Sequence, residues 1–330
     1  MFTREIPELK KVVFPKKVEG KPRNFKKERL TIFFVWLTTV SAILAIIAWR
    51  DGRKWILKLV QKMLAPQVIV SNQIGQTTPK PTPTPKFEKE VEEIKNLTKN
   101  LKGAYGVFVQ DLASRESYGI NQNQVFGAAS LVKLPVLVAL FKEVEAGNLD
   151  LETKYTLKTE DKRSGAGSLY YKPAGTVYTY REMAELMGNQ SDNTAFNVFK
   201  KILGGEKIQG VVNSLGMSQT NFEEFETSPQ DIGRFFYRLY KENILIRDHR
   251  DELLSFLTET AWEDRIPAGI PKEIKVSHKV GTEIGIISDA GIVFAEKPFI
   301  LVILSQGVLE KEAAEILPKI AETVYQQTRD

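Results

Sequence analysis

The sequence has no cysteine and only two histidines, His249 and His278, among its 330 residues. Without thiols the chain has no disulfide, no thiolate metal ligand and no cysteine nucleophile. Two histidines are too few for a histidine-based metal centre, so we expect no metal site. The length is sufficient for one or two domains with a sizeable core, which excludes a disulfide-stabilised miniprotein.

Outside the N-terminal part, the chain has no net positive charge. The whole sequence has a net charge of +5, but residues 1–62 hold 15 Lys or Arg against 5 Asp or Glu. The remaining 268 residues therefore hold 31 basic and 36 acidic side chains. Because phosphate binding needs clustered positive charge on a folded surface, we expect no nucleic-acid partner.

One long apolar run lies near the N-terminus. Residues 30–49 read LTIFFVWLTTVSAILAIIAW, twenty residues without a charge. A helix needs ~20 apolar residues to cross a bilayer, so this run predicts a transmembrane helix. A cleaved signal peptide is the alternative. Its apolar core, however, is shorter, lies nearer the first residue and ends in small residues, whereas this run ends in Trp49.

The flanks of this run indicate its orientation. Residues 10–29 contain nine Lys or Arg and residues 50–69 contain five. Because the more basic flank stays inside, we expect residues 1–29 to be a basic cytoplasmic tail. The rest of the chain would then be extracytoplasmic, held in the cell membrane by a single-pass anchor. Residues 50–70 include WILKLVQKML and form an amphipathic juxtamembrane segment or a plain continuation of the anchor.

Proline separates the anchor from the remaining chain. Residues 71–86 read SNQIGQTTPKPTPTPK, with proline at every second position from 79 to 85. Such a run forms neither a helix nor a central strand and acts as a semi-rigid linker. The folded domain is therefore expected to span residues 87–330, and we expect it to be monomeric.

The hydrophobic periodicity of this domain changes twice along the chain. The patterns predict a helix at 87–101, strands at 104–111 and 116–119, helices at 130–146, 181–188, 192–203, 229–240 and 251–257, strands at 274–280, 285–294 and 299–304, and a helix at 311–327. Two early and three late strands indicate an α+β fold. One antiparallel sheet is built from both chain ends and packs on helices, with an all-helical subdomain between them.

The chain has one Ser-x-x-Lys sequence, from Ser130 to Lys133, in a predicted helix. A three-residue step on a helix places the hydroxyl and the amine on the same face. The helix N-terminus supplies backbone N–H groups for a developing oxyanion, and the apolar surroundings LVKLPVLVALF favour a lowered lysine pKa. Taken alone, the sequence also fits an N-cap serine followed by an ordinary lysine.

Two further short motifs follow Ser-x-x-Lys along the chain. Ser191-Asp192-Asn193 opens a helical pattern, and Lys279-Val280-Gly281-Thr282 ends a strand pattern. With Ser-x-x-Lys before them, they resemble the class A β-lactamase and penicillin-binding serine hydrolase family. The likeness covers essentially all of residues 87–330, including the flanks GVFVQDLASRESYGIN, YTYREMAELMGNQSDNTAFNVF and SHKVGTEIGIISDAGIVF. The family fold, an antiparallel sheet with an all-helical subdomain, agrees with the periodicity.

The resemblance implies a role for each motif in acyl transfer. Ser130 would attack a carbonyl to form an acyl-enzyme, and Lys133 would help to deprotonate it. Ser191 would relay a proton to the leaving nitrogen, and Asn193 would bind the amide on the acyl side of the substrate. The implied chemistry needs no cofactor.

The last motif would bind the other end of the substrate. By the same resemblance, Lys279, Gly281 and Thr282 border the substrate, and Lys279 and Thr282 receive its carboxylate. The backbone N–H groups of Ser130 and Thr282 would form the oxyanion hole. Val280 departs from the family, which has threonine or serine there, so one contact to the carboxylate is lost. We interpret His278, the preceding residue, as a strand residue of alternating exposure.

A second departure concerns the step that follows acylation. Class A β-lactamases carry a long loop with a glutamate that activates the deacylating water, but here residues 215–217 run through SQTNFEEFE almost directly into Thr227. Glu223, Glu224 and Glu226 are the remaining candidates for a water-activating carboxylate; alternatively, they are exposed acids in a turn.

These patterns predict a membrane-anchored extracytoplasmic serine hydrolase that cleaves β-lactam amides through an acyl-Ser130 intermediate. Its partners would be the β-lactam or D-alanyl peptide substrate and the membrane. The short loop and Thr282 favour an alternative, a penicillin-binding D,D-carboxypeptidase or endopeptidase acting on peptidoglycan stem peptides. Another alternative is a sensor that binds β-lactams or cell-wall fragments without turnover.

Overall fold

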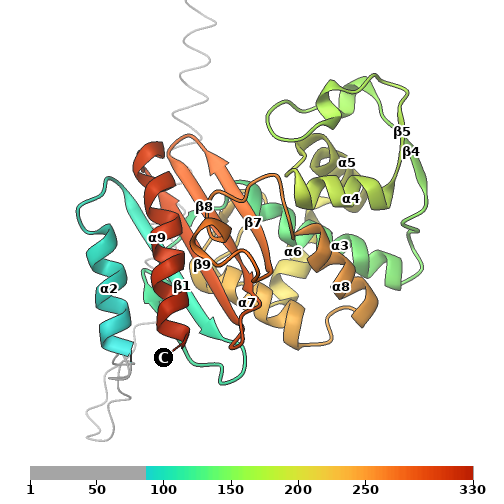
Figure 1. Cartoon of the computed structure of the whole chain (residues 1–330). Helices are drawn as coiled ribbons and strands as arrows, with labels where there is room; N and C mark the ends of the chain where they lie inside the picture. Colours follow the sequence, from blue (N-terminus) through green and yellow to red (C-terminus); the bar gives the residue numbers. More distant parts are fainter. Residues whose placement is uncertain (1–86, 330) are drawn as a thin grey trace, which may run out of the picture. The chain divides into compact units, whose positions relative to one another are not determined.

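A computed structural model describes residues 87–329 of the chain (Figure 1). The predicted tail, transmembrane helix, juxtamembrane segment and linker all lie outside the described residues. Within residues 87–329, no helix combines the length and the apolar character that a bilayer crossing requires.

The centre of the domain is a five-stranded antiparallel sheet in the order β2-β1-β9-β8-β7. Its strands are β1 (Ala104–Asp111), β2 (Ser117–Ile120), β7 (Val276–Glu283), β8 (Ile286–Val293) and β9 (Phe299–Gln306). β1 and β9 pair over eight residues, from Ala104 opposite Gln306 to Asp111 opposite Phe299. The prediction of one sheet built from both chain ends is therefore confirmed.

Helices cover both faces of this sheet, which explains why β9 reads as an unbroken apolar run. Its residues 299, 301 and 303 pack with α2 (Glu88–Thr98) and α9 (Glu310–Arg329), whereas residues 300, 302 and 304 join the core on the other face, under α7 (Pro229–Lys241). Figure 1 shows α2 and α9 on one side of the sheet and α7 on the other. Strand β9 is thus buried on both faces.

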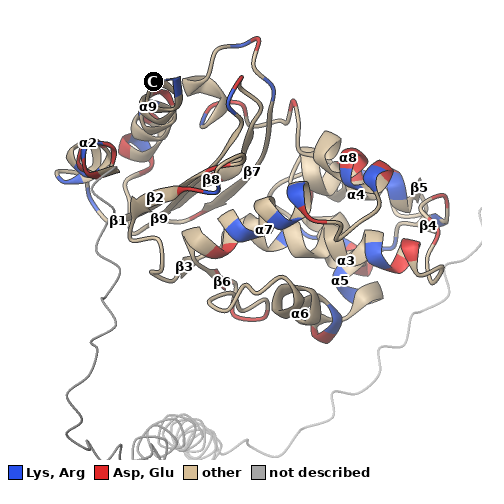
Figure 2. Ribbon diagram, turned by 90° about the horizontal axis from the view of Figure 1, so that it is seen from below, with Lys and Arg blue, Asp and Glu red and all other residues tan. Residues whose placement is uncertain are grey.

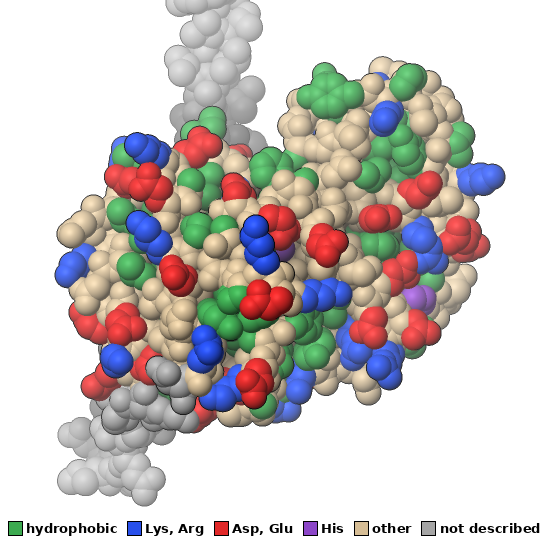
Figure 3. All heavy atoms as spheres, in the orientation of Figure 1, with side chains coloured by type: hydrophobic (Ala, Val, Ile, Leu, Met, Phe, Trp, Pro, Cys, Tyr) green, Lys and Arg blue, Asp and Glu red, His purple; other side chains and the backbone are tan. Residues whose placement is uncertain are grey.

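The remaining helices form a second half around α3 (Lys133–Glu145), whose first nine residues are all buried. The helices α4 (Tyr180–Asn189), α5 (Asn193–Leu203), α6 (Gly205–Ser214) and α8 (Arg247–Phe256) pack around it. Lys and Arg occur together with Asp and Glu on these helices, except on α5, which carries lysines but no acidic residue (Figure 2). Both signs are also mixed on the face that carries α2 and α9 (Figure 3).

Short elements complete the domain. Two small antiparallel ladders pair β3 (Phe126–Gly127) with β6 (Glu226–Thr227) and β4 (Lys154–Thr156) with β5 (Val177–Thr179). Short 3-10 turns are η2 (Ala129–Val132), η3 (Thr159–Asp161), η4 (Leu169–Tyr171) and η5 (Pro267–Gly269).

Three differences from the sequence prediction bear on the site. The helix predicted from residue 130 begins as η2 and becomes α-helical only at Lys133. The strand predicted over 274–280 extends to Glu283, so that Thr282 lies within β7. The two small ladders were not predicted, because strands of two or three residues are too short to show a period. Helix α6 was not predicted either.

Candidate active site

The predicted nucleophile lies in η2, next to a strained residue at the start of this turn. Ala129, the residue before Ser130, has a φ of +44°, a left-handed conformation that costs energy for a residue with a side chain. The surroundings hold it there: the N–H of Ala128 donates to the carbonyl of Phe225 at 2.7 Å. Ser130 is half-buried.

Lys133 brings the first two motifs together. Its Nζ lies 2.8 Å from Ser130 Oγ, 2.7 Å from the carbonyl oxygen of Ser191, 3.1 Å from Ser191 Oγ and 2.7 Å from Asn193 Oδ1. The lysine is 2 % exposed. Ser130 from the first motif and Ser191 and Asn193 from the second therefore meet around the Lys133 amine.

The surroundings of Lys133 favour its neutral form. Burial lowers its pKa to about 7, against the smaller opposing effect of the Asp192 carboxylate. The carbonyls of Ser191 and Asn193 only accept hydrogen bonds, and the Asn193 amide is oriented because its Nδ2 donates to the carbonyl of Ser164 at 2.9 Å. These two acceptors use both N–H groups of a neutral amine, which leaves the lone pair facing the Ser130 hydroxyl. This arrangement suits a general base for Ser130.

A buried cap holds the Ser-Asp-Asn motif in place. Asp192 is the N-cap of α5: its Oδ1 accepts the N–H groups of Thr194 and Ala195, both at 2.9 Å. Its Oδ2 accepts the N–H of Leu169 at 2.8 Å, and the side chain is fully buried. Ser191 just before it adopts a φ of +56°. The cap thus fixes the turn that aims Ser191 and Asn193 at Lys133.

Two glycines in the loop before α4 permit close contact with this cap. Gly165 and Gly167 have φ values of +104° and +95°. A Cβ on Gly165 would lie 2.6 Å from the Asn193 amide nitrogen, and one on Gly167 would overlap the Asp192 carboxylate. Side chains at either position would push the loop off the motif.

Strand β7 approaches the nucleophile from the opposite side. A Cβ on Gly281 would lie 3.0 Å from the carbonyl oxygen of Ala128 and 3.5 Å from the Cβ of Ala129, so the glycine allows β7 to pack against the turn before Ser130. Lys279 on this strand is 1 % exposed. Burial, reinforced by the nearby charge of Lys133, lowers its pKa well below the usual lysine value.

Strand geometry also fixes the direction of the Thr282 amide. The N–H of His278 donates to the carbonyl of Leu257 at 2.7 Å, on the edge of β7 away from β8. Backbone groups of alternate strand residues point to the same edge. The N–H of Thr282, four residues on, therefore faces the open edge, where an oxyanion donor is needed.

The sequence analysis missed Arg265, which lies between α8 and η5. It is 4 % exposed and donates to the carbonyls of Gly281 at 3.2 Å and Ser288 at 2.6 Å, and to Thr282 Oγ1 at 2.6 Å. No pattern around WEDRIP distinguishes it from a solvent-exposed arginine. The structure thus adds a guanidinium to the end of β7 where the hydroxyl of position 280 is missing.

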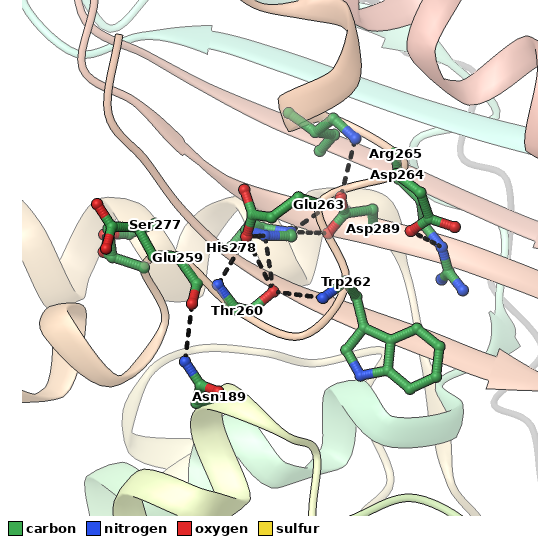
Figure 4. Close-up of polar contacts among 12 residues, drawn as sticks. Asn189, Glu259, Thr260, Trp262, Glu263, Asp264, Arg265, Ser277, His278 and Asp289 are labelled. Carbon is green, nitrogen blue, oxygen red and sulfur yellow. Dashed lines mark hydrogen bonds and ion pairs between the residues drawn. The ribbon is translucent and has the colours of Figure 1, made fainter. Parts of the chain in front are cut away.

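The prediction that His278 has alternating exposure is wrong, since the residue is fully buried. Its Nδ1 lies 2.8 Å from Asp289 Oδ1, and its Nε2 lies 3.2 Å from Glu263 Oε1 (Figure 4). The segment Thr260–Ile266 lies across this ring, so that a side chain predicted to alternate is covered on both sides.

The three candidate glutamates lie apart from Lys133. Glu223 accepts a hydrogen bond from Lys200 at 2.9 Å, whereas Glu224 and Glu226 border a surface pocket with Glu283 and Gln306. All three are exposed. Within residues 87–329, the hydrogen-bond partners of Lys133 include no carboxylate.

Aromatic rings lie on this side of the lysine instead. Lys133 Nζ is 5.7 Å from the ring centre of Phe196, and Phe196 packs at 6.2 Å against both Phe222 and Phe225 of the short loop. The surface next to Lys133 is therefore apolar rather than carboxylate-lined.

Comparison with known proteins agrees with this geometry. Residues 89–328 match the Beta-lactamase enzyme family. The chain belongs to this family. Its catalytic domain is a class A β-lactamase-like serine hydrolase, as the three motifs predict.

Individual relatives of this β-lactamase-like hydrolase are distant. Beta-lactamase 3 of Bacillus cereus is 26% identical over 238 residues, covering 66% of this chain and 74% of the relative. Beta-lactamase VEB-1 of Pseudomonas aeruginosa is 24% identical over 265 residues, covering 72% and 88%. Among solved structures, PBP-A superposes with a TM-score of 0.68 at 28% identity, covering 73% of this chain and 96% of PBP-A.

The pKa of Lys133 predicts a pH profile for Ser130. The rate of labelling by a fluorophosphonate should rise about tenfold per pH unit below pH 7, as the amine loses its proton, and level off above it. Initial rates between pH 5 and 8.5 would test this, with Ser130→Ala as the blank. A flat profile would exclude Lys133 as the base.

The glycine contact predicts a defect at the Ser-Asp-Asn turn. Gly167→Ala should lower the free energy of unfolding by ~1–3 kcal/mol more than Gly175→Ala, because only the first places a methyl group against a buried carboxylate. Gly175 is a matched control: its φ is +91°, and a Cβ there meets nothing within 4 Å. Urea unfolding curves would measure the difference, and equal losses would contradict the close contact.

Proposed function

We propose that this protein cleaves the amide of β-lactams through an acyl-Ser130 intermediate. The carrying observation is the buried amine of Lys133, 2.8 Å from Ser130 Oγ, with a pKa near 7. The relatives named above are β-lactamases, and a mutant of PBP-A is known as an acyl-enzyme complex with penicillin G. Both support a β-lactam as the substrate.

In the proposed reaction, Ser130 Oγ attacks the β-lactam carbonyl while its proton passes to Lys133 Nζ. The N–H groups of Ser130 and Thr282 stabilise the tetrahedral oxyanion. Ser191 Oγ, 3.1 Å from Lys133 Nζ, then gives its proton to the leaving nitrogen and regains one from the lysine. Breaking the C–N bond leaves the acyl ester on Ser130, and Asn193 holds the amide on the acyl side.

The end of β7 would bind the carboxylate of the substrate. Lys279 and Thr282 were inferred for this role, and Gly281 keeps the strand close to Ser130. Arg265 is hydrogen-bonded to the Thr282 hydroxyl and can share the carboxylate with it. The guanidinium thereby replaces the contact that Val280 cannot make.

The apolar surface beside Lys133 favours a second candidate function. Hydrolysis of the acyl ester needs a positioned water and a base. The ring next to Lys133 is that of Phe196, and Phe225 packs against this ring. A slowly hydrolysed acyl-enzyme is the property of a penicillin-binding D,D-carboxypeptidase or endopeptidase, or of a β-lactam sensor. For rapid β-lactamase turnover, Glu223, Glu224 or Glu226 would have to move toward Ser130.

We also propose the domain arrangement that the sequence predicts. Residues 30–49 would anchor the chain in the cell membrane, with residues 1–29 in the cytoplasm. Residues 50–86 would hold a monomeric hydrolase domain outside, where peptidoglycan and β-lactams are found. The charge asymmetry about the apolar run supports this orientation.

The two candidate functions predict different lifetimes for the acyl-enzyme. We expect benzylpenicillin to add its full mass to the purified chain at Ser130. An adduct that persists for minutes would identify the penicillin-binding peptidase or the sensor. Intact-mass spectrometry over time would measure this, with Ser130→Ala as the blank. Loss of the adduct within seconds while the drug is consumed would identify a β-lactamase, and no adduct would refute the acyl-enzyme. If turnover is fast, Glu223→Ala, Glu224→Ala and Glu226→Ala would identify the base.

The proposed anchor predicts membrane retention. The full chain expressed in a bacterium should remain in the membrane after an alkaline wash, and external protease should digest its hydrolase domain. Leu37→Arg with Val40→Arg should release the chain, since both positions lie near the middle of residues 30–49 and each arginine costs ~2.5–3.5 kcal/mol at the centre of a membrane helix. The matched alanine pair should stay bound. A soluble product that begins near residue 50 would instead indicate a cleaved signal peptide.

A further inference from the structure

A buried ionic cluster lies directly behind the substrate-binding end of β7. Within it, His278 is in contact with two carboxylates from different segments. Its Nδ1 lies 2.8 Å and 3.0 Å from the two carboxylate oxygens of Asp289 on β8, and its Nε2 lies 3.2 Å from Glu263 Oε1 (Figure 4). His278 and Asp289 are both completely buried. Removing one member of such a pair leaves an uncompensated buried charge.

The cluster ties the segment Thr260–Ile266 to the sheet at both ends. Near its start, Thr260 Oγ1 lies 3.2 Å from His278 Nε2, and Glu263 accepts the Thr260 N–H at 2.6 Å. At its end, the N–H of Ile266 donates to Asp289 Oδ2 at 3.0 Å. The two side chains that hold the segment are thus the members of the buried pair.

Arg265 is carried by this same segment. It lies between Glu263, which contacts His278, and Ile266, which is bonded to Asp289. Its guanidinium reaches over β7 to Thr282 Oγ1 and to the Gly281 carbonyl. The position of the guanidinium therefore depends on how the segment is fixed, since no regular helix or strand supports this part of the chain.

We propose that His278 is a positioning residue: by binding Asp289 and Glu263 together, it fixes the segment Thr260–Ile266 and holds Arg265 at Thr282 for the substrate carboxylate. The proposal rests on the carboxylate-binding role given to this end of β7 above. His278 itself contacts the two carboxylates of Asp289 and Glu263 (Figure 4).

The charges around His278 give the proposal a pH dependence. Asp289 comes from β8, Glu263 and Arg265 from the segment, and Lys279 is the next residue on β7. Burial by itself lowers the pKa of His278, but the Asp289 charge and the hydrogen bonds to Asp289 and Glu263 outweigh it and raise the pKa to about 9. Because the folded pKa is raised, the ion pair is fully formed below pH 6.5 and is lost as the pH rises through about 9.

The test compares two β-lactams that differ only in the carboxylate. In His278→Gln, acylation of Ser130 by benzylpenicillin should slow about tenfold at pH 7.5, the effect of a lost hydrogen bond to a charged group. Acylation by benzylpenicillin methyl ester should change less than about twofold, because it presents no carboxylate. The tenfold difference between wild type and variant should disappear above pH 9.5, where wild-type His278 is also neutral.

Three controls separate positioning from general damage. His249→Gln removes the other histidine, whose Nδ1 lies 3.0 Å from Glu145 Oε1 and which is not part of this cluster. This variant should leave both rates unchanged. The double variant with Arg265→Ala should be no slower than Arg265→Ala alone, because His278 acts through that arginine. If His278→Gln does not fold, Glu263→Gln, whose side chain is 46% exposed, should give a smaller loss with the same selectivity.

Tryptophan fluorescence provides a readout without substrate. Trp262 lies on the segment, and Trp36→Phe, Trp49→Phe and Trp55→Phe together make it the single tryptophan of the full chain. Its emission should shift in His278→Gln and not in His249→Gln. Equal loss toward acid and ester, or unchanged rates and emission, would overturn the proposal. A wild type that forms no adduct with either compound would instead refute the proposed function, and the emission shift would still decide whether His278 fixes the segment.

Discussion

The arrangement of this domain depends on the burial of one amine. Lys133 has almost no contact with water, and a charged ammonium in that position is costly. Four oxygens from two segments, the turn before α3 and the Ser-Asp-Asn motif, surround it, and burial lowers its pKa to about 7. The turn before α3, the capped start of α5 and the loop of Ser164 must all be in place for the amine to be accommodated. Structural stability and nucleophile activation therefore have the same origin.

The site also requires that backbone segments pack closely on one another, and glycines make this packing possible. Gly281 lets β7 pack on the turn before Ser130, and Gly165 and Gly167 let a loop pack on the Ser-Asp-Asn turn. The segments meet without intervening side chains, so the distances among the functional groups are set by backbone packing. Buried carboxylates at Asp192 and Asp289 then anchor the two sides, one through amides and the other through a histidine.

Much of this arrangement follows from the sequence because it rests on local patterns. Hydrophobic periodicity predicted the sheet, and the order of the three motifs predicted the nucleophile and its partners. Arg265 and the burial of His278 were not predictable, since both depend on an irregular segment that crosses β7 and has no periodicity. The short loop at 216–228 was recognised, but sequence alone could not show that its phenylalanines pack on Phe196, the ring next to Lys133.

The pairing of β1 with β9 has a consequence for how the domain is made. Ala104 pairs with Gln306, so the central sheet joins segments that leave the ribosome about two hundred residues apart. Closing so long a loop is entropically costly and slow, and it waits until the C-terminal strands exist. The helices around Ser130 are synthesised well before β7. A partly made chain therefore carries the nucleophile without the strand that completes its site, and stays inactive until synthesis ends.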